Sequence, residues 1–218
     1  MIKACIFDLD GTLLDTIFTI AYYCNKTLKH FGFEPIEEKE YKYLAGNGAN
    51  LLIERTLNFV GADLSQYYEK ALKYYKGEYD KDANYGTKPF SGIHELLDEL
   101  TKRKIQVFVL SNKPDFATKT TIKTFFGEKV TDTYGARDGV ALKPSTEGID
   151  IILNKYSLSK DECLYIGDTN VDMQTGKNAD IFTIGVLWGF REEKELLENG
   201  ADLIVSSPCE ISEYISKN

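Results

Sequence analysis

Paired cysteines, long apolar runs and an excess of basic residues are all missing from this sequence, and each absence excludes a class of protein. Its 218 residues include four scattered cysteines with no CxxC pair, so we expect neither structural zinc nor a disulfide framework. No apolar run approaches the roughly 18 residues that span a membrane. No charged segment precedes an apolar one, as it would in a secretory signal. We therefore expect a cytoplasmic protein with free thiols.

Positive charge is also scarce. Lysine and arginine number 26 against 34 aspartates and glutamates, which gives a formal net charge of −8. Proteins that bind nucleic acid or an anionic membrane surface present a basic face, so we expect neither partner here. A small anionic substrate is still compatible with this charge, because a bound metal ion and one lysine can reverse the sign locally.

The order of apolar patterns predicts a helical segment inserted into an alternating fold. Residues 2–7 are a short strand candidate, and residues 15–82 have apolar side chains at helical spacing throughout. Ten of the 14 tyrosines lie between Tyr22 and Tyr85, and we expect them to pack a small helical bundle. From residue 90 onward, helical and strand patterns alternate to the end of the sequence.

Strands that alternate with helices imply a parallel, doubly wound sheet. We therefore predict the α/β class, with a core domain formed by residues 1–14 and 83–218. The helical segment, residues 15–82, would be a cap domain inserted directly after the first strand. Sheets of this kind bind ligands beyond the carboxyl ends of their strands, so polar residues that follow apolar strands are the candidates for a site.

The strongest such pattern is DLDGTL at residues 8–13, which ends the first strand. Two carboxylates two residues apart, Asp8 and Asp10, can project the same way from an extended chain. One can then act as a nucleophile while the other moves protons. A calcium loop shares the DxDG string, but its bidentate glutamate is replaced here by Thr19.

Three further patterns follow later strands. Asp168 and Asp172 come at the end of an apolar strand and suit Mg²⁺ as oxygen ligands, although Asp168 or Thr169 could instead cap the next helix. Ser111 and Asn112 end another strand and could bind phosphate oxygens or form a turn. Lys143 precedes a proline, which holds it extended, and it could neutralise a phosphoryl group and an aspartate together. Taken singly, each pattern leaves these alternatives open.

Together, the four motifs resemble the haloacid dehalogenase (HAD) superfamily, and they occur in that family's order over essentially the whole chain. The place of the helical segment matches the family's first type of cap. Within the superfamily, the segments SNKPDFATK, AGNGANLLIERTL and VLWGF resemble phosphoglycolate phosphatases. The resemblance implies a Rossmann-like core and a Mg²⁺-dependent phosphoric monoester hydrolase. It would act on a small phosphorylated metabolite, as a monomer or homodimer.

The resemblance also implies a role for each acidic residue. Asp8 would attack phosphorus and become an aspartyl-phosphate. Asp10 would protonate the leaving oxygen and then activate water, with its backbone carbonyl as a metal ligand. Asp8 and Asp168 would bind Mg²⁺ directly. Asp172 would belong to the metal site without contacting the ion, by holding the groups that do. Asp10 further separates phosphatases from dehalogenases, which lack the second aspartate.

The phosphate-binding residues implied by the resemblance are Ser111, the amide of Asn112, and Lys143. Lys143 would pair with both Asp8 and the phosphoryl group. A carboxylate and a phosphomonoester repel each other, so a cation must offset their charges before attack.

The cap would select the substrate. Gly46, Asn47 and Gly48 form a polar turn that could reach a site when the cap closes, or simply start a helix with Asn47 or Asn50 as its cap. Arg55, one of four arginines, could meet a substrate carboxylate, or it could lie exposed on the helix.

The leading hypothesis is hydrolysis of 2-phosphoglycolate. The alternatives are a sugar phosphomutase of the β-phosphoglucomutase kind, a pyrophosphatase or nucleotidase of the same superfamily, and a binding protein on a retired catalytic fold. The mutase would need a cap that shields the aspartyl-phosphate from water. Retention of every polar core group argues against a binding protein.

Overall fold

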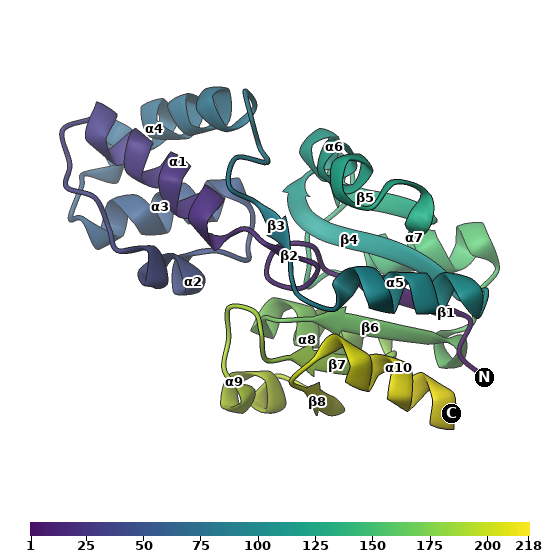
Figure 1. The fold of residues 1–218 in the computed structure, drawn as a ribbon. Helices are drawn as coiled ribbons and strands as arrows, with labels where there is room; N and C mark the ends of the chain where they lie inside the picture. The colour runs from purple at the N-terminus through teal and green to yellow at the C-terminus, as the bar shows by residue number, and fades with distance from the viewer. The chain divides into compact units, whose positions relative to one another are not determined.

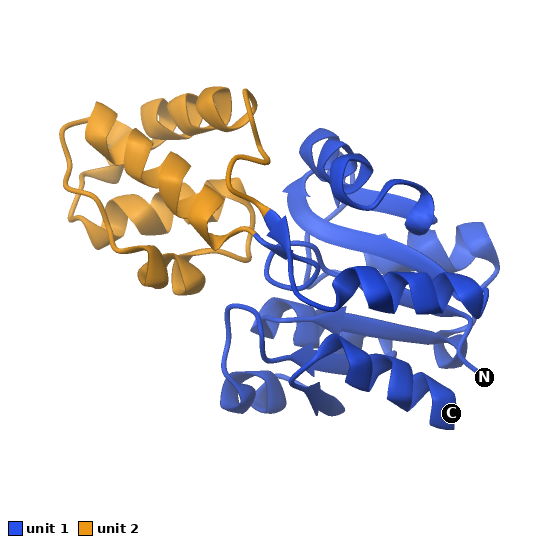
Figure 2. Cartoon of the chain, in the orientation of Figure 1, with its two compact units in different colours: residues 1–15, 88–218 blue, residues 16–87 orange.

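The computed structural model describes all 218 residues, which form two compact units (Figure 2). One unit contains residues 1–15 and 88–218, and the other contains residues 16–87. The helical unit therefore ends at residue 87, five residues later than the expected boundary after residue 82. Residues 83–87 belong to it because they are hydrogen-bonded to its first helix. Thr19 Oγ1 donates to Tyr85 O at 2.7 Å, and it shares a second hydrogen bond, of 2.8 Å, with Thr87 Oγ1. No helix has the length and apolar character needed to cross a membrane.

The first unit is built on a six-stranded parallel sheet in the order β5-β4-β1-β6-β7-β8 (Figure 1). Its central strand, β1, is fully buried between β4 and β6. This arrangement confirms the predicted doubly wound α/β core. The strands are β1 (Ala4–Phe7), β4 (Gln106–Pro114), β5 (Asp132–Ala136), β6 (Cys163–Gly167), β7 (Phe182–Val186) and β8 (Leu203–Val205).

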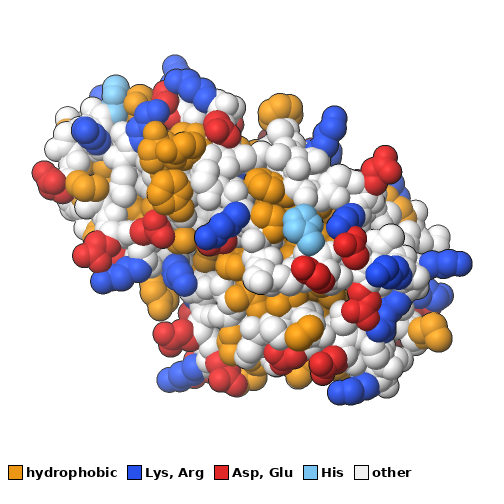
Figure 3. All heavy atoms as spheres, viewed as in Figure 1, with side chains coloured by type: hydrophobic (Ala, Val, Ile, Leu, Met, Phe, Trp, Pro, Cys, Tyr) orange, Lys and Arg blue, Asp and Glu red, His pale blue; other side chains and the backbone are white.

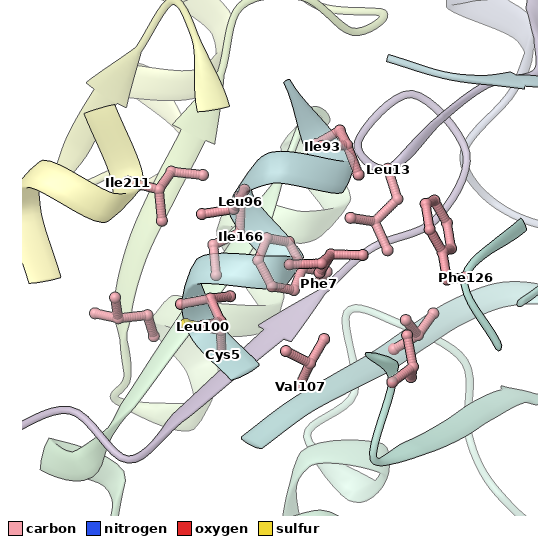
Figure 4. Packing of buried hydrophobic residues seen from close by; sticks show 14 of the residues in the cluster. Cys5, Phe7, Leu13, Ile93, Leu96, Leu100, Val107, Phe126, Ile166 and Ile211 are labelled. Carbon is pink, nitrogen blue, oxygen red and sulfur yellow. The ribbon is translucent and has the colours of Figure 1, made fainter. Parts of the chain in front are cut away.

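Alternate strand residues enter two hydrophobic clusters, as the twofold period of a strand requires. Cys5 and Phe7 of β1 belong to the cluster beneath α5, α6 and α10 (Figure 4), whereas Ala4 and Ile6 belong to the cluster beneath α7 and α8. Because both faces are covered, the strands read as continuous apolar runs. The helices of this unit are α5 (Ile93–Lys102), α6 (Asp115–Phe125), α7 (Glu147–Tyr156), α8 (Asn170–Ala179), α9 (Glu193–Glu198) and α10 (Pro208–Lys217).

Two strand features differ from the sequence pattern. β5 was not predicted, because its sequence DTYGA is polar at one end and contains a glycine in an edge position. β4 continues three residues beyond the expected end at Ser111, to Pro114, and its register against β5 shifts between Leu110 and Pro114. This extension carries polar residues directly to the carboxyl edge of the sheet.

The chain passes between the units through a short antiparallel ribbon. β2 (Leu14–Asp15) pairs with β3 (Lys88–Pro89), and Lys88 Nζ lies 3.6 Å from Asp15 Oδ2. β2 begins four residues after Asp10, so the ribbon is joined to the loop that follows the central strand.

The second unit is helical, as predicted, and its tyrosines contribute to its packing. Tyr41 is fully buried, and Tyr23, Tyr75 and Tyr79 are nearly so, with the ring of Tyr79 5.3 Å from Tyr23 and 5.4 Å from Tyr75. Other tyrosines, such as Tyr43, are exposed. The helices are α1 (Ile17–His30), α2 (Tyr41–Leu44), α3 (Ala49–Phe59) and α4 (Leu64–Tyr79). On the face shown in Figure 3, acidic and basic side chains are interspersed.

Candidate active site

The polar residues of the first unit gather at the carboxyl ends of β1, β4 and β6, which are neighbours in the sheet. Asp8 follows β1, Ser111 and Asn112 lie in the last part of β4, and Asp168 follows β6. Asp8 N donates to Ile166 O at 2.8 Å, so the parallel ladder extends into the first motif. The three motifs therefore meet because parallel strands end at one edge.

A tight loop follows Asp8 and brings the chain against Asp168. Leu13 N and Leu14 N both donate to Leu9 O at 3.0 Å, and Gly11 has a φ of +92°. A Cβ at Gly11 would lie 2.2 Å from Asp168 Oδ2. Glycine is required here for two reasons: the left-handed backbone and the close approach of a carboxylate.

Lys143 joins two aspartates at the centre of the site. Its Nζ lies 2.7 Å from Asp8 Oδ1 and 2.7 Å from Asp172 Oδ1, and the Lys143 and Asp172 side chains are 4% and 1% exposed. Burial and the neighbouring Asp172 raise the pKa of Asp8 to about 7, although Lys143 opposes this shift. Burial lowers the pKa of Lys143, but Asp172 and Asp8 outweigh it and raise that pKa well above its usual value. The ammonium therefore keeps its charge.

Asp172 is held by four donors. Its Oδ1 accepts from Lys143 Nζ and, at 3.2 Å, from Tyr165 OH, and its Oδ2 accepts from Thr169 N and Oγ1 at 3.1 and 2.6 Å. Thr169 in turn caps α8, so the expected helix cap and the acidic site are one arrangement. With both oxygens occupied by protein donors, Asp172 is suited to orienting Lys143.

Asp168 is completely buried, and each of its oxygens has a donor. Thr12 Oγ1 donates to Oδ1 and Phe190 N donates to Oδ2, both at 2.8 Å. Burial, followed by repulsion from Asp172 and Asp8, raises the pKa of Asp168 well above its usual range. A cation bound beside Asp168 would offset this repulsion and favour the ionised carboxylate.

The side chain of Asn112 fixes the backbone of Lys143. Asn112 Oδ1 accepts from Lys143 N at 2.9 Å, and Asn112 Nδ2 donates to Lys143 O at 3.1 Å. Ser111 Oγ, two residues along β4 from Lys113, accepts from Lys113 N at 3.2 Å. Ser111 and Asn112 are both buried beside this lysine loop, so the predicted phosphate-binding residues lie together.

The site residue that sequence reasoning missed is Lys113. Its Nζ lies 3.1 Å from Asp10 Oδ1, with the lysine side chain 3% exposed and the aspartate side chain 21% exposed. Nothing in the sequence separates this residue from the other lysines except its place directly after Ser111 and Asn112. Asp10 therefore has a cation of its own, and its side chain is more exposed than those of Asp8 and Asp172.

The donor set fits a divalent cation. Ligand atoms of Asp8, Asp168 and Asp172 lie within 4.8 Å of one another, and all three residues are buried. Carboxylate oxygens are the ligands that Mg²⁺ prefers, and Lys143 alone offsets only one of the three charges. Asp8 and Asp168 have capacity for a cation, since each of their oxygens accepts at most one hydrogen bond.

Comparison with known proteins places this fold and site in a family. Residues 5–186 match the family described as haloacid dehalogenase-like hydrolase. The chain belongs to that family. The expectation of a phosphatase-type hydrolase of the HAD superfamily is confirmed with it.

The relatives of this HAD hydrolase match most or nearly all of its length. A phosphoglycolate phosphatase of Vibrio parahaemolyticus is 24% identical over 99% of this chain and 96% of its own, and one of Rhodospirillum rubrum is 28% identical over 88% and 83%. A crystal structure from Lactobacillus delbrueckii subsp. bulgaricus, provisionally named a phosphoglycolate phosphatase, covers 98% of both chains. It has a TM-score of 0.91 and 27% identity.

In the helical unit of this HAD hydrolase, Gly46 and Gly48 both have positive φ values, of +112° and +83°. Gly48 is the N-terminal cap of α3, and no side chain bonds there, so the alternative in which Asn47 or Asn50 caps this helix is wrong. Asn50 Oδ1 instead accepts from Lys76 Nζ at 3.2 Å.

Arg55 is half-buried, and its Nη1 donates to Leu44 O at 3.1 Å. The side chain is thus tied to the backbone that leads into the Gly46–Gly48 turn. A role of this turn and of Arg55 in substrate choice stays a prediction.

Proposed function

We propose that this HAD hydrolase is a Mg²⁺-dependent phosphomonoesterase that acts through an aspartyl-phosphate, with 2-phosphoglycolate as its best substrate. The observation that carries the proposal is the environment of Asp8. Lys143 Nζ holds Asp8 Oδ1 at 2.7 Å, and the Asp8 side chain is 10% exposed. A carboxylate fixed by one oxygen at the edge of a sheet can present the other to phosphorus.

In the first step, an Asp8 oxygen forms a bond to phosphorus while the ester bond between phosphorus and the leaving oxygen breaks. Lys143 offsets the charge of both the carboxylate and the phosphoryl group, and Ser111 and the amide of Asn112 hold phosphoryl oxygens. Mg²⁺, held by Asp8, Asp168 and the backbone carbonyl of Asp10, would supply further positive charge to the transferred group. Alignment and charge are most of what phosphoryl transfer requires.

Asp10 moves the protons of both steps. It gives a proton to the leaving oxygen, which departs as an alcohol, and then takes a proton from the water that attacks the aspartyl-phosphate. The second step releases inorganic phosphate and restores Asp8. The 21% exposure of the Asp10 side chain supports this role, because a proton-transfer group must reach both the leaving group and water.

The names of these relatives, phosphoglycolate phosphatases that match most of both chains, support 2-phosphoglycolate as the substrate. We propose that the turn at Gly46, Asn47 and Gly48, together with Arg55, contributes to this choice. Free cysteines, three of them buried, support a cytoplasmic setting with a small phosphorylated metabolite as the partner.

The test is phosphate release by the purified protein with Mg²⁺. The substrates are 2-phosphoglycolate, β-glucose 1-phosphate, pyrophosphate, nucleoside monophosphates and nitrophenyl phosphate, with Asp8→Asn as the matched control. We expect 2-phosphoglycolate to have the highest kcat/KM and the variant to release no phosphate. Isomerisation of β-glucose 1-phosphate without release would instead identify a mutase. Release that is unchanged in Asp8→Asn would contradict the proposed nucleophile.

A further inference from the structure

The site contains one buried ammonium for each aspartate of the first motif. Lys143 contacts Asp8, and Lys113 contacts Asp10 at 3.1 Å. The proposed mechanism uses Lys143 at the phosphoryl group but gives Lys113 no task. Because Asp10 acts at the ester oxygen, Lys113 marks the side of the site where the leaving group lies.

The backbone fixes Lys113 in this place. β4 shifts its register between Leu110 and Pro114, and such irregularities redirect side chains beside active sites. Lys113 N donates to Ser111 Oγ at 3.2 Å, and Lys113 O accepts from Thr118 Oγ1 of α6 at 3.1 Å. The backbone that positions the ammonium is therefore held by hydrogen bonds at both its N–H and its carbonyl group.

Packing alone does not account for a buried ammonium, because its desolvation reduces the stability of the folded protein. Removing lysine from water carries a desolvation cost, and apolar side chains of similar volume often stabilise such positions equally well or better. Lys113 is 3% exposed, whereas its partner Asp10 keeps contact with solvent. Asp10 does not need this ammonium to satisfy a fully buried charge, and a charged ligand group that enters the site beside Asp10 would make use of it.

We propose that Lys113 binds a carboxylate on the leaving group and thereby selects phosphate monoesters of hydroxy acids. This inference rests on the proposed function, which places Asp10 at the ester oxygen. In 2-phosphoglycolate one methylene carbon joins the ester oxygen to the carboxylate, so a group that contacts Asp10 lies within reach of that carboxylate.

Lysine suits this task because its ammonium can donate several hydrogen bonds, one of them to Asp10. The same charge offsets the repulsion between the substrate carboxylate and the acidic side chains of the site. Lys113 is then a specificity residue in the core. It is separate from Arg55, whose Nη1 donates to Leu44 O within the helical unit.

The experiment compares 2-phosphoglycolate with 2-hydroxyethyl phosphate, in which a neutral hydroxymethyl group replaces the carboxylate. The variants are Lys113→Met, Lys113→Gln and Lys113→Arg. Lys119→Met, which removes a 55% exposed lysine of α6, is the control. All are first checked for folding by urea unfolding, and Lys113→Gln serves if the methionine variant does not fold.

We expect wild type to prefer 2-phosphoglycolate. Lys113→Met should lower kcat/KM for 2-phosphoglycolate on the order of 10- to 100-fold, the size of a charge-assisted hydrogen bond. The same variant should lower kcat/KM for 2-hydroxyethyl phosphate much less, because only the contact between Lys113 and Asp10 is lost there. Lys113→Arg should recover much of the loss, and Lys119→Met should match wild type on both substrates.

Equal losses on the two substrates in Lys113→Met and Lys113→Gln would overturn the inference, since Lys113 would then act only through Asp10. A wild-type enzyme that hydrolyses both substrates equally well would overturn it too. Failure of the proposed function gives a different result: wild type would then release no phosphate from either substrate in an Asp8-dependent way.

Discussion

Replacing Lys143 with methionine should destabilise the metal-free protein more than any surface charge change of the same kind. The ammonium lies 2.7 Å from both Asp8 and Asp172, and the two partner side chains are only 10% and 1% exposed. The variant keeps the volume of the side chain but leaves two buried carboxylates without their cation. Breaking a buried pair in this way costs about 3–5 kcal/mol of unfolding free energy.

The pH dependence of this loss follows from Asp8. Its pKa is already raised to about 7 by burial and Asp172, and Lys143 acts against that shift. Without Lys143 the carboxyl group should hold its proton to still higher pH in the folded state. Protonation removes the uncompensated charge, so the destabilisation should be larger at pH 7.5 than at pH 5.5.

The assay is urea unfolding of wild type and Lys143→Met in EDTA at both pH values. Lys119→Met, which breaks an exposed pair within α6, is the control and should cost about 0.5 kcal/mol or less. A loss in Lys143→Met no larger than that of the control, or one that grows as the pH falls, would refute this account of the buried charges.

Three further predictions concern the metal, the acid and the loop. In EDTA, wild-type stability should fall as the pH rises from about 4 to 7, because the folded state holds a proton on Asp8 that the unfolded chain has released. Mg²⁺ should then stabilise more at pH 7.5 than at pH 5.5 in thermal unfolding, and equal stabilisation would contradict the carboxylate site. Asp10→Asn should lower kcat on alkyl phosphates far more than on nitrophenyl phosphate, whose leaving group needs little protonation; equal losses would argue against the acid role. Gly11→Ala should weaken Mg²⁺ binding in a calorimetric titration, because its Cβ would lie 2.2 Å from Asp168 Oδ2. Gly61→Ala, where φ is also positive but nothing lies within 4 Å, should not.

The core and its acidic site were predictable because two simple sequence patterns indicate them. Strands buried on both faces appear as apolar runs, and the residues directly after such runs must lie at one edge of a parallel sheet. Asp8, Ser111 and Asp168 could be placed together on that basis. β5 could not be found in this way, since its edge position tolerates the polar and glycine residues of DTYGA.

The supporting contacts of the site were not predictable, because they depend on chain segments far apart in sequence. Thr12 and Phe190 both donate to Asp168, and no pattern in the sequence connects the three. Lys113 is another example. Its significance comes from the 3.1 Å contact with Asp10, which requires the extension of β4 and its shift in register.

The central claim is that Asp8 becomes phosphorylated during turnover. The most direct measurement is an acid-quenched single turnover of 2-phosphoglycolate with Mg²⁺, followed by mass spectrometry of the peptide that contains residue 8. Asp10→Asn, loaded with nitrophenyl phosphate, should accumulate the intermediate because hydrolysis by water is slowed. The account predicts a phosphoryl group on Asp8 that decays as phosphate appears, and none in Asp8→Asn. Phosphate release with an Asp8 peptide that stays unmodified at every time, in wild type and in Asp10→Asn, would contradict it.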